Sequence, residues 1–290
     1  MDAKFHPAIV AIKTCDLERL RALVHADPSL ATSRSSTSHP TLLQCLVLSA
    51  KDAPNKLEMA KVLVNAGADL NGPLSACGSC DNVGVAELLL DSGAAIDGTG
   101  GWSPLEEALY WNSRRMIDLL IQRGACIQNL RIASGLGRTD RIEALFNPDG
   151  SLKPEAGKIN WPWGDLDVIG KSNFDAEGRQ SLAAKFSSWT NDRQSIVNNA
   201  FVYACMHGHP DAANLLLTKG AQINVIPGGF DYAGTGLHYA ALNGLRSMVE
   251  FLIQHGADVH IKDAKVGGTA ADWADYGKQP ELRDYLKSLL

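Results

Sequence analysis

The chain has 290 residues, of which 45% are hydrophobic and 20% are charged, and its net charge is −5. Such a composition is ordinary for a folded protein and excludes disorder as a global description. Because phosphate binding needs a concentrated Lys and Arg surface, and the sequence contains no basic run, we expect no nucleic-acid partner.

The N-terminal segment does not have the pattern of a secretory leader. Asp2, Asp16 and Glu18 surround a short apolar stretch, and no small-residue cleavage site follows it. No apolar stretch approaches the roughly 20 residues that a membrane helix needs. The cysteines are scattered through helical patterns, as reduced core thiols are, so we expect a cytoplasmic protein with no membrane partner. They are Cys15, Cys45, Cys77, Cys80, Cys126 and Cys205.

A Leu-rich phrase followed by Gly and, in every case, Ala recurs along the chain. It reads VLVNAGADLN at 62–71, LLLDSGAAID at 88–97, LLIQRGACIQ at 119–128, LLLTKGAQIN at 215–224 and FLIQHGADVH at 251–260. The Leu-rich part predicts a helix, and the Gly-Ala that follows allows a tight exit from it. The recurrence therefore predicts a repeated unit that ends in a helix and a turn.

A second phrase precedes the Leu-rich one. It reads WSPLEEA at 102–108, TGLHYAA at 235–241 and, in a weaker form, TAADWA at 269–274. The Ser or Thr can cap a helix through its hydroxyl, and Pro at the first helical position lacks only a donor that would be unpaired there. The phrase resembles the Thr-Pro-Leu-His-x-Ala-Ala signature of ankyrin repeats, whose period is about 33 residues.

This resemblance implies an all-α fold, an ankyrin-repeat α-solenoid of about eight helix-turn-helix units with short β-hairpin fingers, in a single domain over residues 1–290. The last unit carries polar and charged residues on its outer helix, as a capping repeat should. The units align at about 5–36, 37–71, 72–99, 100–127, 128–146, 198–230, 231–262 and 263–290.

The fifth unit departs from the repeat. Its Leu-rich phrase fails at Phe146, so we expect its hairpin to be missing, and more than two periods separate Gly137 from the equivalent Gly208. The sequence therefore predicts an insertion at 147–197, which closes with helical sequence from about 180 to 205.

Three tryptophans, Trp161, Trp163 and Trp189, lie in this insertion and argue against disorder. The insertion is either a folded excursion that covers or borders the groove between units five and six, or a patch over the edge left by the missing hairpin. Asp165 and Asp167, close to two of the tryptophans, are either an acid/base pair or solvated loop carboxylates.

Repeat proteins of this family bind through the concave face, built from the hairpin tips and the exposed side of each first helix. At the position where the family usually has His, His238 matches, and the resemblance implies a hydrogen bond from it to the backbone of the adjoining loop. Glu106, Arg131 and Asp272 depart from the pattern, which makes them functional candidates. Glu106 and Arg131 are either binding residues or an inter-repeat ion pair. The position reads along the chain Gln44, Ser75, Glu106, Arg131, Val202, His238 and Asp272.

Aromatic residues concentrate at groove-facing positions, where they serve either as core or as anchors of a binding site. Phe230 and Tyr276 belong to this group. The predicted binding residues are Trp102, Glu106, Tyr110, Trp111, Arg131, Trp161, Trp163, Tyr203, Tyr232, His238, Tyr239 and Trp273.

Catalytic and metal motifs are weak, and we expect no metal and no cofactor. Cys77 and Cys80 form a CxxC, but a structural zinc site needs a second ligand pair, and no pair has suitable spacing. Cys205 lies near His207 and His209, but His209 occupies the Gly-His position of the repeat and Cys205 replaces a core Ala.

Two functions follow, and both are kept open. The first is a non-enzymatic binding module, a monomer that recognises a protein or peptide through its concave face. The second is an enzyme or small-molecule binder with a pocket between the insertion and the groove; its catalytic candidates are Asp165, Asp167, Glu106 and Arg131. An array that regulates a separately encoded enzyme is a form of the first, and the short, unfused architecture fits a bacterial cytoplasmic protein.

Overall fold

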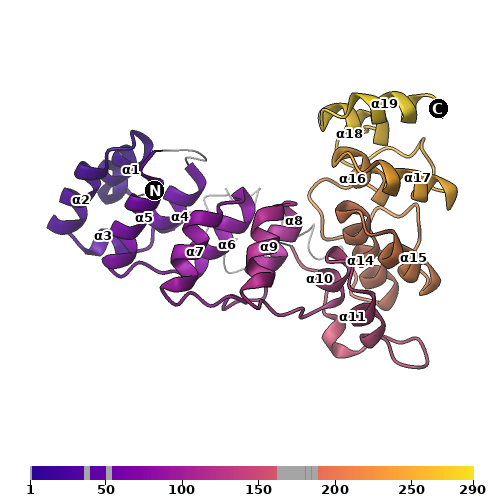
Figure 1. Cartoon of the computed structure of the whole chain (residues 1–290), viewed down its shortest axis with the longest axis horizontal. Coiled ribbons are helices and arrows are strands. Elements are labelled where there is room, and N and C mark those ends of the chain that lie inside the picture. Colours follow the sequence, from indigo (N-terminus) through magenta and orange to yellow (C-terminus); the bar gives the residue numbers. More distant parts are fainter. Residues whose placement is uncertain (1, 36–39, 50–53, 162–179, 181–183, 185–188) are drawn as a thin grey trace. The chain divides into compact units, whose positions relative to one another are not determined.

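A computed structural model describes residues 2–35, 40–49, 54–161, 180, 184 and 189–290. Its helices follow one another as antiparallel pairs joined by short loops (Figure 1). The pairs form two compact units, the first up to Cys126 and the second from Ile127 to Trp161 and from 189 to Leu290.

The first unit contains four helical pairs. They are α1 (His6–Lys13) with α2 (Leu17–Ala26), α4 (Leu42–Ser49) with α5 (Lys56–Asn65), α6 (Asn71–Cys80) with α7 (Val83–Asp91), and α8 (Pro104–Tyr110) with α9 (Arg114–Gln122). A short 3₁₀ helix η1 (Ala3–Phe5) precedes them, and a single helical turn α3 (Ser29–Thr32) follows α2. The first helices α1, α4, α6 and α8 pack side by side in that order, and the second helices α2, α5, α7 and α9 do the same.

Leucines of the paired helices form the core of this row. Leu46, Leu63, Leu74 and Leu89 lie on four successive helices and are fully buried. Each such side chain stabilises the fold by about 1.5–3 kcal/mol relative to an exposed position. Every pair buries this face against its neighbours, so the row is held together by contacts between adjacent pairs.

The second unit also contains four pairs. They are α10 (Leu130–Gly135) with α11 (Thr139–Ala144), α14 (Arg193–His207) with α15 (Pro210–Thr218), α16 (Gly236–Leu242) with α17 (Arg246–Gln254), and α18 (Ala270–Tyr276) with α19 (Pro280–Lys287). A short 3₁₀ helix η2 (Pro154–Ala156) lies between α11 and α14 in the chain. The first helices α10, α14, α16 and α18 again pack in order. The described residues thus hold eight pairs, which confirms the predicted helical repeat.

Capping at the start of the first helices follows the prediction. The Ser103 hydroxyl accepts from the Glu106 backbone N–H (3.1 Å), and the Glu106 carboxylate accepts from the Ser103 N–H (2.9 Å). Thr269 and Asp272 make the same reciprocal pair at α18. Gly208, directly after α14, has φ +76°, a left-handed conformation that favours glycine.

The expected β-hairpin fingers are wrong in their detail, since no strand ladder forms in the part of the chain that the structure describes. Instead, an Asn or Asp side chain just after the Gly-Ala phrase accepts from a backbone N–H of the next finger. Asn71 accepts from Ala95 N (2.8 Å), and Asp97 accepts from Cys126 N (2.8 Å). Asn224 and Asp258 N form the same bond at 2.9 Å. These side-chain bonds satisfy the backbone donors that strand pairing would otherwise use.

The region of the predicted insertion differs from expectation at both ends. An isolated antiparallel bridge joins Phe146 and Leu152, in the unit whose hairpin we expected to be missing. Helix α14 begins at Arg193 and residues 189–192 are not helical, so the helical sequence predicted from about 180 to 205 is interrupted before α14. Asp192 caps α14 by accepting from Ser195 N (2.8 Å), which explains where the helix begins.

Arg193 fastens the turn after Phe146 to the rest of the second unit. Its guanidinium donates to the carbonyl of Gly150 and to that of Lys219, both at 2.7 Å. The same guanidinium lies 5.6 Å from the centre of the Phe146 ring.

Within the described residues, no helix is both long enough and apolar enough to span a membrane.

Candidate functional site

The aromatic residues predicted in the fourth pair surround a carboxylate that the sequence analysis did not single out. Glu107 accepts from the indole N–H of Trp102 (2.6 Å) through Oε2. Its Oε1 accepts from the indole N–H of Trp111 (2.8 Å) and from the Ser79 hydroxyl (2.6 Å). We call these four residues with Tyr110 the Glu107 cluster.

The rings of the Glu107 cluster meet edge to face. Tyr110 lies 6.2 Å from Trp102 and 5.2 Å from Trp111 between ring centres, with interplanar angles of 74° and 79°. Glu107 is buried, Trp102 and Tyr110 are half-buried, and Trp111 is 43% exposed. The cluster therefore presents the exposed indole of Trp111, whose N–H edge is hydrogen-bonded to the buried Glu107 carboxylate.

Burial raises the pKa of the Glu107 carboxyl above its ordinary value, and the negative charge of Glu106 adds to the shift. The hydrogen bonds from Ser79 and the two indoles act in the opposite direction and favour the carboxylate. A charged group in this position is therefore costly, and the three donors offset part of the cost.

Close packing of α6 on α8 places Ser79 against Glu107. A Cβ at Gly78 would lie 3.1 Å from Glu107 Cβ and from the Ala108 backbone nitrogen. Glycine at this position lets the two helices approach closely enough for the Ser79 hydroxyl to reach the carboxylate.

Two predicted residues at the His position lie outside this cluster. Glu106 is buried and forms the capping box with Ser103, so its carboxylate stabilises the start of α8. Arg131, on α10 in the other compact unit, is buried and donates to the Lys158 carbonyl (3.1 Å).

The second unit brings five of the predicted groove-facing aromatic residues together. The rings of Tyr203, Phe230 and Tyr239 contact one another at a tilt, with ring centres 4.9 and 5.0 Å apart, and all three are buried. The next ring is Trp273, 5.1 Å from Tyr239 and 6.2 Å from Tyr232. Most of this chain of rings is core.

Tyr232 is the exposed end of this row of aromatic rings. It is 48% exposed, and the Lys265 ammonium lies 4.4 Å from its ring centre, within cation–π distance. Lys265 also pairs with Asp231 (2.8 Å), which holds the ammonium beside the ring. Tyr276, at the end of α18, is 80% exposed.

His238 makes the contact that the family resemblance implied. One ring nitrogen is 3.2 Å from the Gly268 carbonyl of the adjoining loop, and the other is 2.8 Å from the Thr235 hydroxyl. Burial lowers the pKa of His238 below its ordinary value, so the neutral ring is favoured. The imidazole thus links the start of α16 to the loop before α18.

Two of the three tryptophans of the predicted insertion, Trp161 and Trp189, are among the described residues of the second unit. Trp161 is buried and meets Trp189 edge to face, with ring centres 6.1 Å apart. Trp163, Asp165 and Asp167 lie outside the described residues. Next to Trp189 is a cavity of about 380 Å³, lined by apolar groups such as Ile159 and Val225 and by polar groups such as Asn198.

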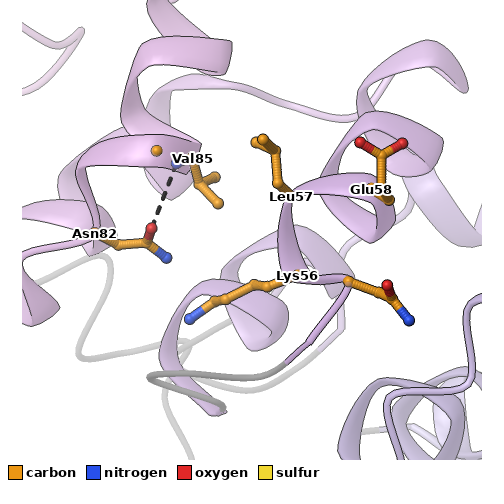
Figure 2. Close-up of a pocket in the computed structure, with 7 residues that line it drawn as sticks. Lys56, Leu57, Glu58, Asn82 and Val85 are labelled. Atoms are coloured by element: carbon orange, nitrogen blue, oxygen red, sulfur yellow. Dashed lines mark hydrogen bonds between the residues drawn. The ribbon is translucent and has the colours of Figure 1, made fainter.

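A second cavity, of about 420 Å³, lies between the starts of α5 and α7 (Figure 2). Figure 2 shows Lys56 and Leu57 on one side and Asn82 and Val85 on the other. The Lys56 ammonium donates to the Val47 carbonyl (2.7 Å) and Asn82 caps α7 through Val85 N (3.3 Å), so both polar groups serve the fold.

Among the residues that the structure describes, no group of three or more His, Cys, Asp or Glu side chains could hold a metal ion.

Sequence reasoning missed Glu107 and Ser79 for different reasons. Glu107 and Trp111 are four residues apart on one helix and therefore share a face, a spacing that could have identified the pair. The contact of Ser79 with Glu107 depends on how closely α6 and α8 pack, which no local pattern reveals.

Comparison with known proteins agrees with the repeat architecture. The family model for ankyrin repeats (3 copies) matches residues 180–263. The chain is 36% identical over 97 residues to Ankyrin repeat and SOCS box protein 6 from Homo sapiens, and 35% identical over the same length to the proteins of that name from Pongo abelii and Mus musculus. Each match covers 33% of this chain and 22% of the relative.

These relatives are mammalian, so the bacterial source and the cytoplasmic location remain predictions from sequence. Ankyrin repeats are generic protein–protein interaction modules. The matched segment carries the same recurring phrases and paired helices as the rest of the described chain. The chain is therefore an ankyrin-repeat protein.

Proposed function

We propose that this protein binds a protein or peptide partner through aromatic side chains on and beside its first helices. The exposed rings of Trp111 in the first unit and of Tyr232 and Tyr276 in the second unit are the contact residues. Aromatic rings of this kind supply large contact area with few rotatable bonds, which makes them frequent anchors of interfaces.

The observation that carries the proposal is the Glu107 cluster. A 43% exposed indole is normally unrestrained, whereas Trp111 is tied through its N–H to a buried carboxylate at 2.8 Å. An exposed ring with a fixed orientation loses little entropy when a partner packs on it. This supports a binding role for the surface around Trp111.

The test compares three variants of the full chain. Trp111→Ala and Tyr232→Ala remove the proposed anchors, and Ile121→Ala is the control because Ile121 is 39% exposed on the second helix α9. Partners captured on the immobilised protein are identified, purified and titrated by calorimetry. We expect each aromatic variant to weaken Kd by at least about tenfold, since anchor residues contribute more than about 1.4 kcal/mol. If both aromatic variants bind with an unchanged Kd, or if Ile121→Ala no longer binds the partner, the proposal is contradicted.

A second candidate function is the binding of a small molecule in the cavity beside Trp189. Its support is that residues of the predicted insertion, Ile159 and Trp189, line this 380 Å³ space together with Asn198 and Val225. Cavities of this size with apolar walls and a few polar groups are typical of small-ligand sites. Catalytic roles for Asp165, Asp167, Glu106 and Arg131 remain predictions from sequence.

A thermal-shift screen against metabolites tests this second candidate. Val225→Phe fills the cavity, and Val266→Phe is the control because Val266 is 80% exposed on a loop. The account expects a compound that raises Tm in the native protein and in Val266→Phe but not in Val225→Phe. If no compound raises Tm, or if Val225→Phe responds like the native protein, the cavity has no such role.

A further inference from the structure

We infer that Glu107 is a positioning residue whose buried carboxylate fixes the indoles of Trp102 and Trp111 in one arrangement before a partner arrives. The inference rests on the proposed function, because it names the group that keeps the aromatic contact surface preformed. It assigns a role to a residue that touches no partner itself.

The hydrogen bonds around Glu107 converge from three directions. Trp102, two residues before α8, Trp111, directly after α8, and Ser79, on the neighbouring helix α6, all donate to this carboxylate. An indole has one donor and no acceptor, and an ionised carboxylate accepts only, so these groups are complementary in one protonation state. One side chain thus links three segments of the first unit.

The geometry leaves each indole little freedom. The donor–acceptor distances of 2.6 and 2.8 Å are those of charge-assisted bonds, which are shorter and stronger than bonds between neutral groups. Tyr110 lies between the two tryptophans and meets both edge to face. Rotation of either indole would break a bond to the carboxylate and a ring contact at the same time.

A purely structural role explains the carboxylate less well. Helix α8 is already capped by Ser103 and Glu106. Helix α6 already packs closely on α8, since a Cβ at Gly78 would lie only 3.1 Å from the Ala108 backbone nitrogen. Burial disfavours the charged form of Glu107, so an apolar side chain would fit the helix interface without that penalty. What the carboxylate adds is the orientation of two indole N–H groups.

Nuclear magnetic resonance of the two indole N–H groups tests the inference without a partner. Trp102→Phe and Trp111→Phe assign the resonances, and exchange of the indole hydrogens with water is then measured in the native chain. We expect exchange at least about tenfold slower than in a solvent-exposed tryptophan, because both N–H groups are held by a charged acceptor. Exchange of the Trp111 hydrogen at the free rate overturns the inference.

Glu107→Gln supplies the matched perturbation, since its amide keeps the shape but has an NH₂ group in place of one acceptor oxygen. At least one of the two indole resonances should shift and lose its protection, while the far-ultraviolet circular dichroism is retained. Ser79→Ala is the control, because it removes the third donor and leaves both indole bonds. Unchanged indole resonances in Glu107→Gln contradict the inference, and the native-chain exchange rates decide it if that variant fails to fold.

The two proposals fail in different ways. Protected indoles together with a Trp111→Ala variant that keeps its partner would disprove the proposed function and leave the positioning role intact. Freely exchanging indoles together with loss of the partner in Trp111→Ala would disprove the positioning role alone.

Discussion

Asp263 holds the loop before α18 in the way that Glu107 holds two indoles. Its carboxylate accepts from the backbone N–H groups of Lys265 (2.8 Å), Val266 (2.7 Å) and Gly268 (2.8 Å), and from the indole of Trp273 (3.0 Å). Burial raises the pKa of Asp263, but these four donors outweigh it and lower the pKa to about 2. The loop that presents Val266 to solvent is therefore closed by one ionised side chain.

We predict that Asp263→Asn lowers the free energy of unfolding by about 1–3 kcal/mol at neutral pH, because the amide NH₂ faces donors that it cannot accept from. Because the folded-state pKa lies below the ordinary 3.8, the contribution of Asp263 is present above 3.8 and is lost as the pH falls toward about 2. Urea unfolding of both proteins at about pH 7 and about pH 3 measures the difference. An equal difference at the two pH values would argue against this role.

Sequence position singled out Trp102, Trp111 and Tyr232 as candidate binding residues, because the repeat phrases indicate where each first helix begins. It did not separate exposed rings from core rings: Tyr203 and Tyr239 occupy similar positions and are buried. Exposure depends on how neighbouring pairs pack, and that information is not local.

At the scale of elements, glycines set the distance between first helices. A Cβ at Gly277, directly after α18, would overlap the carbonyl of Leu242 at the end of α16. Gly84, in α7, has nothing within 4 Å of its Cβ position. These two positions therefore respond to alanine in opposite ways.

We expect Gly277→Ala to lower the free energy of unfolding by about 1–3 kcal/mol, because the backbone contact between α16 and α18 cannot yield as a flexible side chain would. Gly84→Ala should raise it by about 0.5–1 kcal/mol, since alanine has the higher helix propensity and the site is open. Denaturant titration of both variants measures these changes. Stabilisation by Gly277→Ala would show that the helices are not in close contact there.

The capping box of α8 gives a second prediction at this scale. Ser103→Ala removes the hydroxyl that accepts from Glu106 N, and caps of this kind contribute about 0.5–2 kcal/mol. Thermal unfolding of the variant should show that loss. A Ser103→Thr variant should retain most of the native Tm, and equal Tm values for the Ala variant and the native chain would contradict the assignment.

Helix ends were predicted better than the segments between helices. The Ser or Thr before α8, α16 and α18 is a local signal, because the cap bonds lie within one turn. The fingers were expected to pair as β-hairpins, whereas Asn71 and Asp97 bond to backbone groups of the next finger. Whether a finger pairs as a strand or bonds through a side chain depends on the neighbouring repeat, so the sequence of a single repeat does not reveal it.

At the scale of the molecule, the described residues hold eight helical pairs that share one packing arrangement. Each pair buries its apolar face against its neighbours, and the proposed binding surface lies on the exposed sides of the first helices. The number of pairs could be predicted by aligning the whole sequence to the repeat, although the Leu-rich phrase itself occurs only five times. The lining of the cavity beside Trp189 could not, because it combines Ile159 and Asn198 with a loop from the next pair.

The most direct test of the account is hydroxyl-radical footprinting of the full chain with and without its captured partner. The account predicts that oxidation of Trp111 and Tyr232 slows by at least about threefold in the complex, because a partner covers anchor residues in an interface. Ile121, exposed on the second helix α9, should oxidise at the same rate in both states. Protection of Ile121 with no change at Trp111 and Tyr232 would contradict the claim that the aromatic side chains on and beside the first helices form the binding surface.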